Sequence, residues 1–186
     1  VILLSASGQV GFFGSTRNTP IAVARWYSHD NGTTWTQPDD ITDHIYSLFD
    51  GEGKSPLGKV ESLFFGSGRI CQSRLVRIGR YHRLYAALCA RPGGNRVVYS
   101  DDFGRSWQPL GSIDKSPAPQ GDEPKVEELP NGDVVLSSRA YGGRFFNLFH
   151  YMSHKNATGT WDAEAVHSAE VAGGVKALQN STNGEI

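Results

Sequence analysis

An eight-residue turn motif that occurs twice constrains the fold of this chain more than any other sequence feature. Residues 28–35 read SHDNGTTW and residues 100–107 read SDDFGRSW, so both fit the pattern Ser-x-Asp-x-Gly-x-Thr/Ser-Trp. In such a turn the Asp carboxylate accepts hydrogen bonds from backbone amides, Gly permits a positive φ, and Trp packs over the turn. The residues that define the two copies are Ser28, Asp30, Gly32 and Trp35, and Ser100, Asp102, Gly104 and Trp107.

Around these turns the alternation of apolar and polar residues predicts three units of four strands. The units span about 1–38, 66–112 and 123–165, and the start of a fourth is expected at about 175. The expected strands are 1–6, 9–14, 21–28 and 34–37 in the first unit, 70–78, 82–90, 96–100 and 106–110 in the second, and 125–129, 133–139, 144–153 and 160–163 in the third. Residues 39–57 are expected to form an irregular insertion.

Repeated four-stranded units predict an all-β fold, a six-bladed β-propeller of antiparallel blades of which this chain holds about three. The composition agrees, because 22 glycines, 9 prolines and 11% aromatic residues favour short strands and tight turns over helices. We therefore interpret the chain as part of a longer one. An open half-ring is expected to be inactive alone and prone to associate, with Val134, Leu136 and Phe146 partly exposed.

Charge and cysteine content narrow the function classes. A formal net charge of -1 gives no basis for nucleic-acid binding, and the apolar runs are too short to cross a membrane. Twelve of the 18 basic residues are arginine, the side chain suited to binding carboxylate or phosphate groups. Cys71 and Cys89 lack metal-ligand spacing and are expected to face each other as buried thiols across a hairpin centred on Arg80. No metal or other cofactor is expected.

The connections of a four-stranded meander alternate between two rims, and arginines gather on the rim away from the Asp-containing turns. If Asn131 and Gly132 are the two central residues of a hairpin loop, paired positions sum to 263, so Glu123 faces Ala140 and Arg139 faces Pro124. Spacing alone also fits a half-exposed ion pair of about 0 to 1 kcal/mol. The other candidate ligand contacts on this rim, which are equally compatible with solubilising side chains, are Arg17, Arg69, Arg91 and Arg144.

Residues 123–139, EPKVEELPNGDVVLSSR, together with the two turns, resemble the bacterial exo-sialidases (neuraminidases) of glycoside hydrolase family 33, whose propellers carry Asp-box (BNR) repeats. The resemblance covers nearly the whole chain. It implies that Glu123 is the base that activates a tyrosine nucleophile, and that Arg139 belongs to an arginine triad that binds the sialic acid carboxylate. Residues 66–70, GSGRI, resemble a glycine-rich segment that lies near the substrate without taking part in the chemistry.

The resemblance further implies hydrolysis of terminal α-linked sialic acid from glycoconjugates with retention of configuration, and an extracellular, periplasmic or cell-surface location. The family's Arg-Ile-Pro segment and aspartate general acid have no counterpart before Ser28 and are expected upstream of Val1. Its third arginine and its nucleophile have no persuasive match in residues 140–186. Tyr141 and Tyr151 are expected to be strand or rim residues.

Two alternatives remain open. A trans-sialidase has the same turns but transfers the sugar to an acceptor. A non-catalytic Asp-box propeller that binds a glycan or a protein is also compatible with the turns, because they mark an architecture and not an activity. Glu123 and Arg139 at one hairpin end favour the enzyme.

Overall fold

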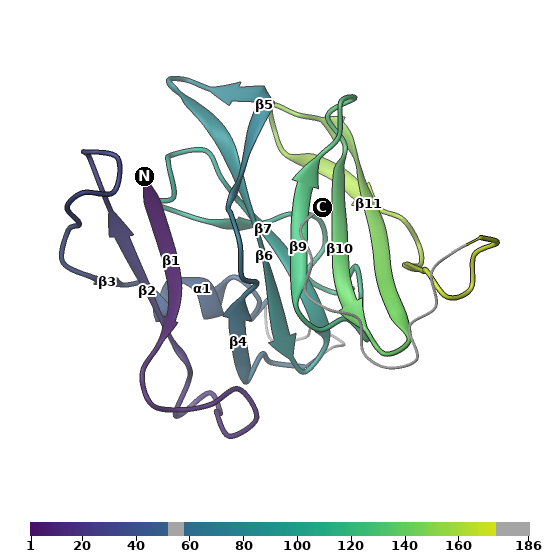
Figure 1. Ribbon diagram of the computed structural model, residues 1–186, viewed down its shortest axis with the longest axis horizontal. Helices are drawn as coiled ribbons and strands as arrows, with labels where there is room; N and C mark the ends of the chain where they lie inside the picture. The colour runs from purple at the N-terminus through teal and green to yellow at the C-terminus, as the bar shows by residue number, and fades with distance from the viewer. Residues whose placement is uncertain (52–57, 174–186) are drawn as a thin grey trace.

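The computed structural model describes residues 1–51 and 58–173, which form three antiparallel sheets in chain order and one short helix (Figure 1). The first sheet contains β1 (Ile2–Ser7), β2 (Ala22–Tyr27) and β3 (Asp39–Asp40), and α1 (Thr42–Ser47) follows it. The second contains β4 (Ser62–Phe65), β5 (Cys71–Ile78), β6 (Tyr81–Arg91), β7 (Gly94–Ser100) and β8 (Gln108–Pro109). The third contains β9 (Pro124–Glu128), β10 (Val134–Ala140), β11 (Gly143–Ser153), β12 (Thr158–Trp161) and β13 (Val166–His167). The prediction of an all-β antiparallel fold is confirmed.

The first sheet has three strands where the sequence predicted four. β1 pairs directly with β2, so the expected strand over 9–14 is wrong. Those residues lie in the connection from 8 to 21, where the amides of Gly14 and Ser15 both donate to the carbonyl of Gly11. The ring of Phe12 packs edge-on against Phe64 at 4.9 Å between centroids. The apolar residues of this segment therefore reflect packing of a compact loop and not a strand.

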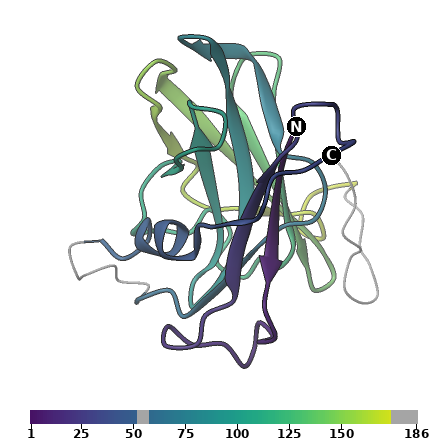
Figure 2. The ribbon, with the colours of Figure 1, turned by 90° about the vertical axis from the view of Figure 1, so that its left-hand side faces the viewer.

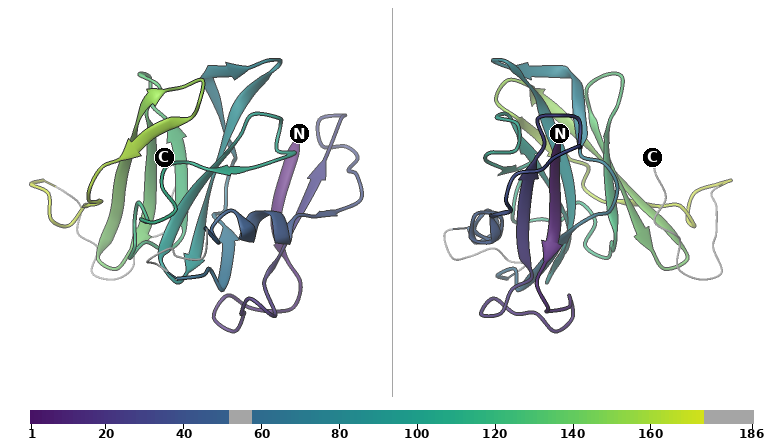
Figure 3. Two further views of the ribbon diagram at one scale, coloured as in Figure 1. Left: turned by 180° about the vertical axis from the view of Figure 1, so that it is seen from behind. Right: turned by 60° about the vertical axis from the view of Figure 1, so that its left-hand side comes forward.

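The end of the first unit also differs from the prediction. The strand expected over 34–37 lies instead at β3, which pairs with Ala24 and Arg25 of β2. The predicted insertion therefore contains a strand and α1. Tyr46 of α1 is buried, and its hydroxyl accepts a hydrogen bond from the amide of Leu63 at 3.2 Å. Figure 3 shows from behind that α1 lies between the first and second sheets.

In the second sheet the first strand is broken into two pieces. β4 pairs with the end of β6 and β5 pairs with its beginning, so both lie on the same side of β6. The sheet order is β4-β6-β7-β8 with β5 also paired to β6. Residues 66–70 separate the two pieces. This interruption places the glycine-rich segment beside β9 of the next sheet.

The two cysteines do not face each other as predicted. Cys71 lies opposite Tyr85, whereas Cys89 lies opposite Phe64 and Asn95, because β6 is paired at its far end with β4 and not with β5. Both thiols are free and buried, as expected. Burial raises the pKa of each thiol to about 12, and Glu127 adds to this effect at Cys71.

Two apolar cores lie between neighbouring sheets. The first joins Val23, Ile45 and Leu88 to the fully buried Trp107, and it holds the first sheet and α1 against the second. The second joins β6 and β7 to the third sheet around Phe149. Val134 and Leu136 are fully buried in this core, so the expectation that they are partly exposed is wrong. Phe146, at 37% exposure, is the member of that set that reaches solvent.

The two Asp-containing turns have matching hydrogen bonds. Asp30 accepts from the amide of Thr34 at 2.8 Å, and Asp102 accepts from the amide of Ser106 at 2.9 Å. Gly32 and Gly104 have φ angles of 93° and 75°. These contacts agree with the carboxylate and glycine roles expected of the motif. The tryptophans differ, because Trp35 is 41% exposed over its own turn whereas Trp107 is fully buried in the first core.

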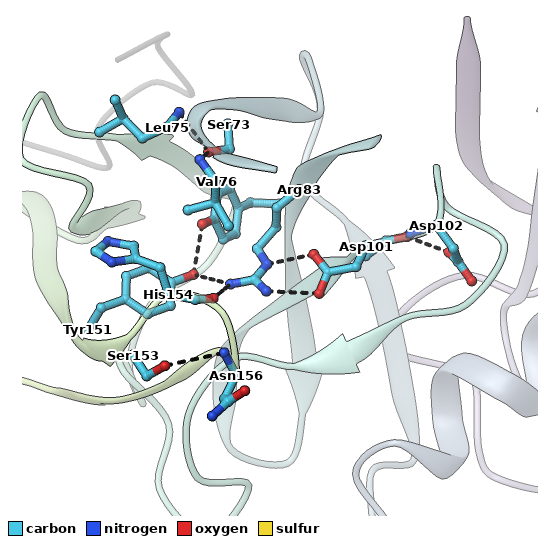
Figure 4. Close-up of polar contacts among 12 residues, drawn as sticks. Ser73, Leu75, Val76, Arg83, Asp101, Asp102, Tyr151, Ser153, His154 and Asn156 are labelled. Atoms are coloured by element: carbon cyan, nitrogen blue, oxygen red, sulfur yellow. Dashed lines mark hydrogen bonds and ion pairs between the residues drawn. The ribbon is translucent and has the colours of Figure 1, made fainter. Parts of the chain in front are cut away.

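A buried arginine fastens the second sheet to the third (Figure 4). Arg83 has no exposed surface, and its Nε and Nη2 donate to the two carboxylate oxygens of Asp101 at 2.7 and 2.8 Å. Its Nη1 donates to the carbonyl of His154 at 2.6 Å and to the hydroxyl of Tyr151, which in turn pairs with Tyr85 at 2.7 Å. The guanidinium thus donates hydrogen bonds to Asp101 after the second sheet and to Tyr151 and His154 of the third.

Successive connections lie at opposite ends of the sheets and define two rims (Figure 1). The link rim contains residues 8–21, 92–93 and 141–142 and the beginnings of β4 and β9. The turn rim contains residues 28–35, 79–80, 101–107 and 129–133. In Figure 1 the link rim is at the bottom and the turn rim at the top. The predicted start of a fourth unit at about 175 lies outside the described residues.

Candidate functional site

The loop between β9 and β10 has three residues and not the predicted two. The amide of Gly132 donates to the carbonyl of Leu129, and the amide of Leu129 donates to the carbonyl of Asp133, both at 2.8 Å. Gly132 has a φ of 90°, which fits a type I turn followed by a residue in the left-handed region. Val134 therefore pairs with Glu128, and paired positions sum to 262. The predicted register was wrong by one residue.

This register places Arg139 directly opposite Glu123. The amide of Arg139 donates to the carbonyl of Glu123 at 3.1 Å. Directly opposite residues project from the same face of a sheet, and Nη1 of Arg139 lies 3.2 Å from Oε2 of Glu123. The two side chains are 28% and 34% exposed, so the pair is open to solvent at the link rim.

Asp122 is a second carboxylate at this arginine. Its Oδ2 lies 3.7 Å from the same Nη1 atom of Arg139, and its amide donates to the carbonyl of Arg139 at 2.9 Å. Within residues 1–51 and 58–173, Nε and Nη2 of Arg139 have no hydrogen-bond partner. These N–H groups form the edge of the guanidinium that binds a carboxylate through two parallel hydrogen bonds.

The buried Asn95 of β7 positions the segment that leads into Glu123. Its Nδ2 donates to the carbonyl of Asp122 at 2.6 Å, and its own amide donates to the carbonyl of Ala118 at 3.1 Å. Ser116 donates through its hydroxyl to the carbonyl of Asn95 at 2.8 Å. The second sheet therefore holds the backbone on which the carboxylate of Glu123 is mounted.

Two glycines allow close approaches at this end of the hairpin. A Cβ atom at Gly121 would collide with the side chains of Asn95 and Ser138. A Cβ atom at Gly66 would collide with the backbone of Pro124, the residue after Glu123. The glycine-rich segment 66–70 therefore begins against the start of β9, near the Glu123–Arg139 pair.

Arg144 is the predicted arginine that lies next to this pair. It is directly opposite Arg139 in the β10–β11 register, and its Nε donates to the hydroxyl of Ser137 at 2.8 Å. Burial lowers the pKa of Arg144. Two guanidiniums and the carboxylate of Glu123 thus belong to one corner of the third sheet.

The other three predicted arginines are engaged in contacts of their own. Arg17 pairs with Asp50 and donates to the carbonyl of Val60, and Arg91 donates to the carbonyls of Phe12 and Ser15. These contacts hold the 8–21 connection against the second sheet. Arg69 is 68% exposed and pairs with Glu127 of β9. Within residues 1–51 and 58–173, no hydrogen bond or ion pair joins Arg17 or Arg91 to Glu123 or Arg139.

The two tyrosines considered as nucleophiles are placed as the sequence predicted, on a rim and on a strand. Tyr141 lies in the β10–β11 connection and is 77% exposed, and no hydrogen bond joins its hydroxyl to the carboxylate of Glu123. Tyr151 lies on β11, and burial is the main cause of its raised pKa. Residues 1–51 and 58–173 contain no group of three or more His, Cys, Asp or Glu side chains that could hold a metal ion.

The sequence analysis gave Asp122 no role at this site and missed Asn95. The sequence GDEP places Asp122 beside Glu123, but only the actual register shows that both carboxylates reach one arginine. No local pattern marks Asn95, because its role depends on contact between two sheets.

In the part of the chain that the structure describes, no helix is long and apolar enough to cross a membrane.

No family model matches the chain. Among solved structures, it is similar to the intramolecular trans-sialidase from Ruminococcus gnavus in complex with oseltamivir carboxylate, with 23% identity, a TM-score of 0.55, and coverage of 81% of this chain and 27% of that one. A Hadza microbial sialidase gives 21% identity, a TM-score of 0.54, and coverage of 79% and 25%. A leech intramolecular trans-sialidase complexed with 2,7-anhydro-Neu5Ac gives 20% identity, a TM-score of 0.51, and coverage of 78% and 19%.

The chain therefore spans about a quarter or less of the length of these proteins. At these levels of identity the likeness concerns the fold. It agrees with the resemblance drawn from residues 123–139 and from the two Asp-containing turns. Over about four fifths of its length, the chain is similar in fold to the matched part of these sialidases and trans-sialidases.

Proposed function

We propose that this chain is part of the catalytic propeller of an enzyme that cleaves terminal α-linked sialic acid from glycoconjugates with retention of configuration. The observation that carries the proposal is the Glu123–Arg139 pair, at 3.2 Å and open to solvent on the link rim. Glu123 is the base, and Arg139 binds the carboxylate of the sugar. The tyrosine nucleophile comes from outside this chain.

The geometry suits this division of roles. Arg139 meets Glu123 through Nη1 only, so its Nε and Nη2 edge remains for a ligand carboxylate. Arg144 adds a second positive charge beside it. The proposed contacts of Arg17, Arg69 and Arg91 with substrate are less favoured, because each has a contact within the protein that explains its position.

A tyrosine nucleophile has a physical reason in this chemistry. The anomeric carbon of sialic acid carries a carboxylate, so a negatively charged nucleophile would approach against like charge. A neutral tyrosine that gives its proton to Glu123 as it attacks avoids that repulsion, and sialidases use tyrosine for this step. Water then hydrolyses the sialyl-tyrosine intermediate. Arg139 holds the substrate carboxylate through both steps.

We propose that this chain forms half of a closed six-bladed ring. The three sheets correspond to three of six blades, and the remaining blades, the missing triad arginines, the aspartate general acid and the nucleophile belong to flanking sequence. Sialylated glycans outside the cell are the substrates, which places the enzyme in an extracellular, periplasmic or cell-surface location. A non-catalytic propeller that binds glycan or protein through the same rim is the alternative from another functional class.

The test measures sialic acid release by the full-length protein that contains residues 1–186, with wild type, Glu123→Gln and Arg139→Lys compared. Glu123→Gln keeps the shape of the side chain but removes the base, so kcat is expected to fall by several orders of magnitude. Arg139→Lys loses two-point carboxylate binding, so KM is expected to rise. Thermal unfolding of each variant shows whether the fold is retained.

The products identify the reaction. Free sialic acid indicates hydrolysis, and a 2,7-anhydro product indicates intramolecular transfer. A folded wild-type protein that releases neither product but binds immobilised sialoside supports the non-catalytic alternative. Activity of Glu123→Gln close to that of wild type would overturn the assignment of the base.

A further inference from the structure

The second sheet carries an unbalanced positive charge that the proposed function does not use. Residues 62–100 contain no Asp or Glu, whereas the chain as a whole has a net charge of -1. The arginines of this stretch are Arg69, Arg74, Arg77, Arg80, Arg83, Arg91 and Arg96. Arg74, Arg77 and Arg80 are exposed, and none of them forms an ion pair within residues 1–51 and 58–173. All three lie on β5 or on the hairpin that follows it.

At the tip of this hairpin, two guanidiniums converge on one phenol. Nη2 of Arg80 and Nη1 of Arg105 both donate to the hydroxyl oxygen of Tyr81, the latter at 3.0 Å. Their Cζ atoms lie 4.6 and 5.6 Å from the centroid of the Tyr81 ring. Both arginines are exposed, and Arg105 forms no ion pair in the described ranges. Two like charges therefore share a neutral acceptor.

The nearby carboxylates are already used. Asp101 binds Arg83 through both oxygens. Asp102 accepts from Ser100 and from the amide and hydroxyl of Ser106, and it reaches Arg105 by a hydrogen bond only through its backbone carbonyl, at 3.0 Å. An anion from solution is thus the group that could neutralise Arg80 and Arg105 together.

Tyr81, which binds Arg80 and Arg105, is the last member of a stack of three aromatic rings. Tyr27, Phe103 and Tyr81 stack in that order, with centroid distances of 6.1 and 5.7 Å and interplanar angles of 21°. Arg25, which is buried, pairs with Asp39 and donates to the carbonyl of Arg105 at 2.7 Å. The backbone that carries Arg105 is therefore held by the first sheet. Preorganised donors of this kind bind a ligand with little loss of conformational entropy.

Phe103 occupies a backbone position that disfavours a bulky side chain. Its φ is 62°, and the equivalent residue in the other Asp-containing turn is Asn31, with φ 60°. Asparagine tolerates this left-handed conformation, whereas an aromatic residue there is strained. The strain is offset by the contacts of Phe103 with Tyr27 and Tyr81 and with the first core. The stack is thus a specific feature of the second turn.

We propose that Arg80 and Arg105, seated on Tyr81, form a binding site for the oxyanion groups of an acidic polysaccharide. The site lies on the turn rim, at the opposite end of the sheets from Glu123 (Figure 1). Arg77 is also exposed, but it lies opposite His82 whereas Tyr81 lies opposite Ile78, so Arg77 projects from the other face of the hairpin and is not part of this site. Arg80 and Arg105 come from two different loops and each can bind one oxyanion group, so a chain that carries several such groups suits the site better than a single ion. The site does not depend on the proposed sialidase function, since no residue of the Glu123 site contributes to it.

The test measures binding of the full-length protein that contains residues 1–186, with Glu123→Gln present throughout so that no sialic acid is released, to four probes by calorimetry at low and physiological salt. The probes are heparin for sulfate groups, polysialic acid for carboxylate groups, neutral dextran, and inorganic sulfate. At least one acidic polysaccharide is expected to bind, with affinity that falls as salt screens the charges, and dextran is expected not to bind. Which of the two binds identifies the oxyanion.

Variants distinguish the site from general attraction. Arg80→Gln and Arg105→Gln should each weaken binding by about tenfold or more, the loss expected for a charge-assisted hydrogen bond. Lys59→Gln makes the same change in charge at an exposed residue before β4 and should leave the affinity within about twofold. Tyr81→Phe keeps the ring but releases both guanidiniums, so it should weaken binding without lowering the melting temperature by more than a few degrees.

Two results would overturn the proposal. One is that neither polysaccharide binds, or that inorganic sulfate binds as tightly as the polymers. The other is that Lys59→Gln weakens binding as much as the arginine variants do. Circular dichroism of each variant verifies that a loss of binding does not come from unfolding.

Discussion

Arg139 lies directly opposite Glu123 across the β9–β10 hairpin, and the two residues are joined both by a backbone hydrogen bond of 3.1 Å and by a side-chain ion pair of 3.2 Å. The backbone bond fixes the register, and the register determines that both side chains emerge on one face. A shift of one residue would send one of them to the other face. The three-residue loop is therefore as important for the site as the two charged residues.

Asn95 is expected to stabilise the fold because it donates from a fully buried position to the carbonyl of Asp122 at 2.6 Å. In Asn95→Ala that carbonyl loses its partner, so the free energy of unfolding should fall by about 1 to 3 kcal/mol. Urea denaturation at neutral pH measures the change. Asn156→Ala, which alters an exposed asparagine, should remain within about 0.5 kcal/mol of wild type. Equal stability of the two variants would contradict this role.

The sequence predicted the all-β antiparallel fold and most strands of the second and third sheets, because these strands have strong alternation and bounded turns. Residues 9–14 misled the prediction, since Phe12 and Phe13 between glycines resemble a short strand although they fold as a loop. The register of β9 and β10 could not be chosen from Asn131 and Gly132 alone, because two-residue and three-residue loops both use a glycine there. Local patterns describe single strands, and they carry no information on contacts between sheets.

Arg83 and Asp101 are expected to be strongly coupled. Asp101→Asn removes the compensating charge from a guanidinium that has no exposed surface, so stability should fall by roughly 3 kcal/mol, at the lower end for buried pairs because Asp101 is 29% exposed. In Arg83→Met/Asp101→Asn the buried charge is absent. The double variant should therefore lose less stability than the sum of the two single changes. Additive losses in urea denaturation would indicate that the pair is not coupled.

His150 is expected to make stability depend on pH. It lies 2.8 Å from Asp133 and 3.1 Å from Asp162, and its pKa is raised above the ordinary value, first by the hydrogen bond to Asp133 and then by the charges of both carboxylates. The stabilisation is fully present below the unfolded pKa of about 6.5 and is lost as pH rises through the higher folded pKa. The stability difference between wild type and His150→Gln should therefore be larger at pH 5.5 than at pH 9.

An NMR titration of His150 measures the same effect directly. Asp133→Asn should lower the midpoint toward the ordinary value, and Asp162→Asn should lower it less, because Asp133 makes the shorter contact. A midpoint of wild-type His150 at or below about 6.5 would contradict the expected direction of the pKa shift.

β1 has an unpaired edge that is expected to cause association of the chain. Val1 and Ser28 exchange two hydrogen bonds, at 2.7 and 2.9 Å, so in β1 the odd-numbered residues bond to β2 and Ile2, Leu4 and Ala6 direct their amides and carbonyls the other way. Within the described residues β1 pairs with β2 only. Figure 2 shows the first sheet from the left-hand side of Figure 1, with β1 beside β2.

In the second and third sheets, the strands that correspond to β1 are β6 and β10, and neither has a free edge on the corresponding side. β6 is covered by β4 and β5, and β10 is covered by β9. Beside β1 lies a cavity of about 330 Å³ whose apolar lining includes Leu4, Ile70 and Leu84. An extended strand from another copy of the chain could therefore add to β1 and bury apolar surface at the same time.

A lysine on this edge is expected to prevent the contact, because a charged side chain is the common protection of an edge strand. Leu3 is 46% exposed, and Leu3→Lys should lower the association constant of residues 1–186 by about tenfold or more in sedimentation equilibrium. Leu75→Lys makes the same substitution at a leucine of β5 that is 57% exposed and away from β1, so it should associate like wild type. If the two variants behave alike, β1 is not the contact, and the exposed face around Phe146 becomes the stronger candidate.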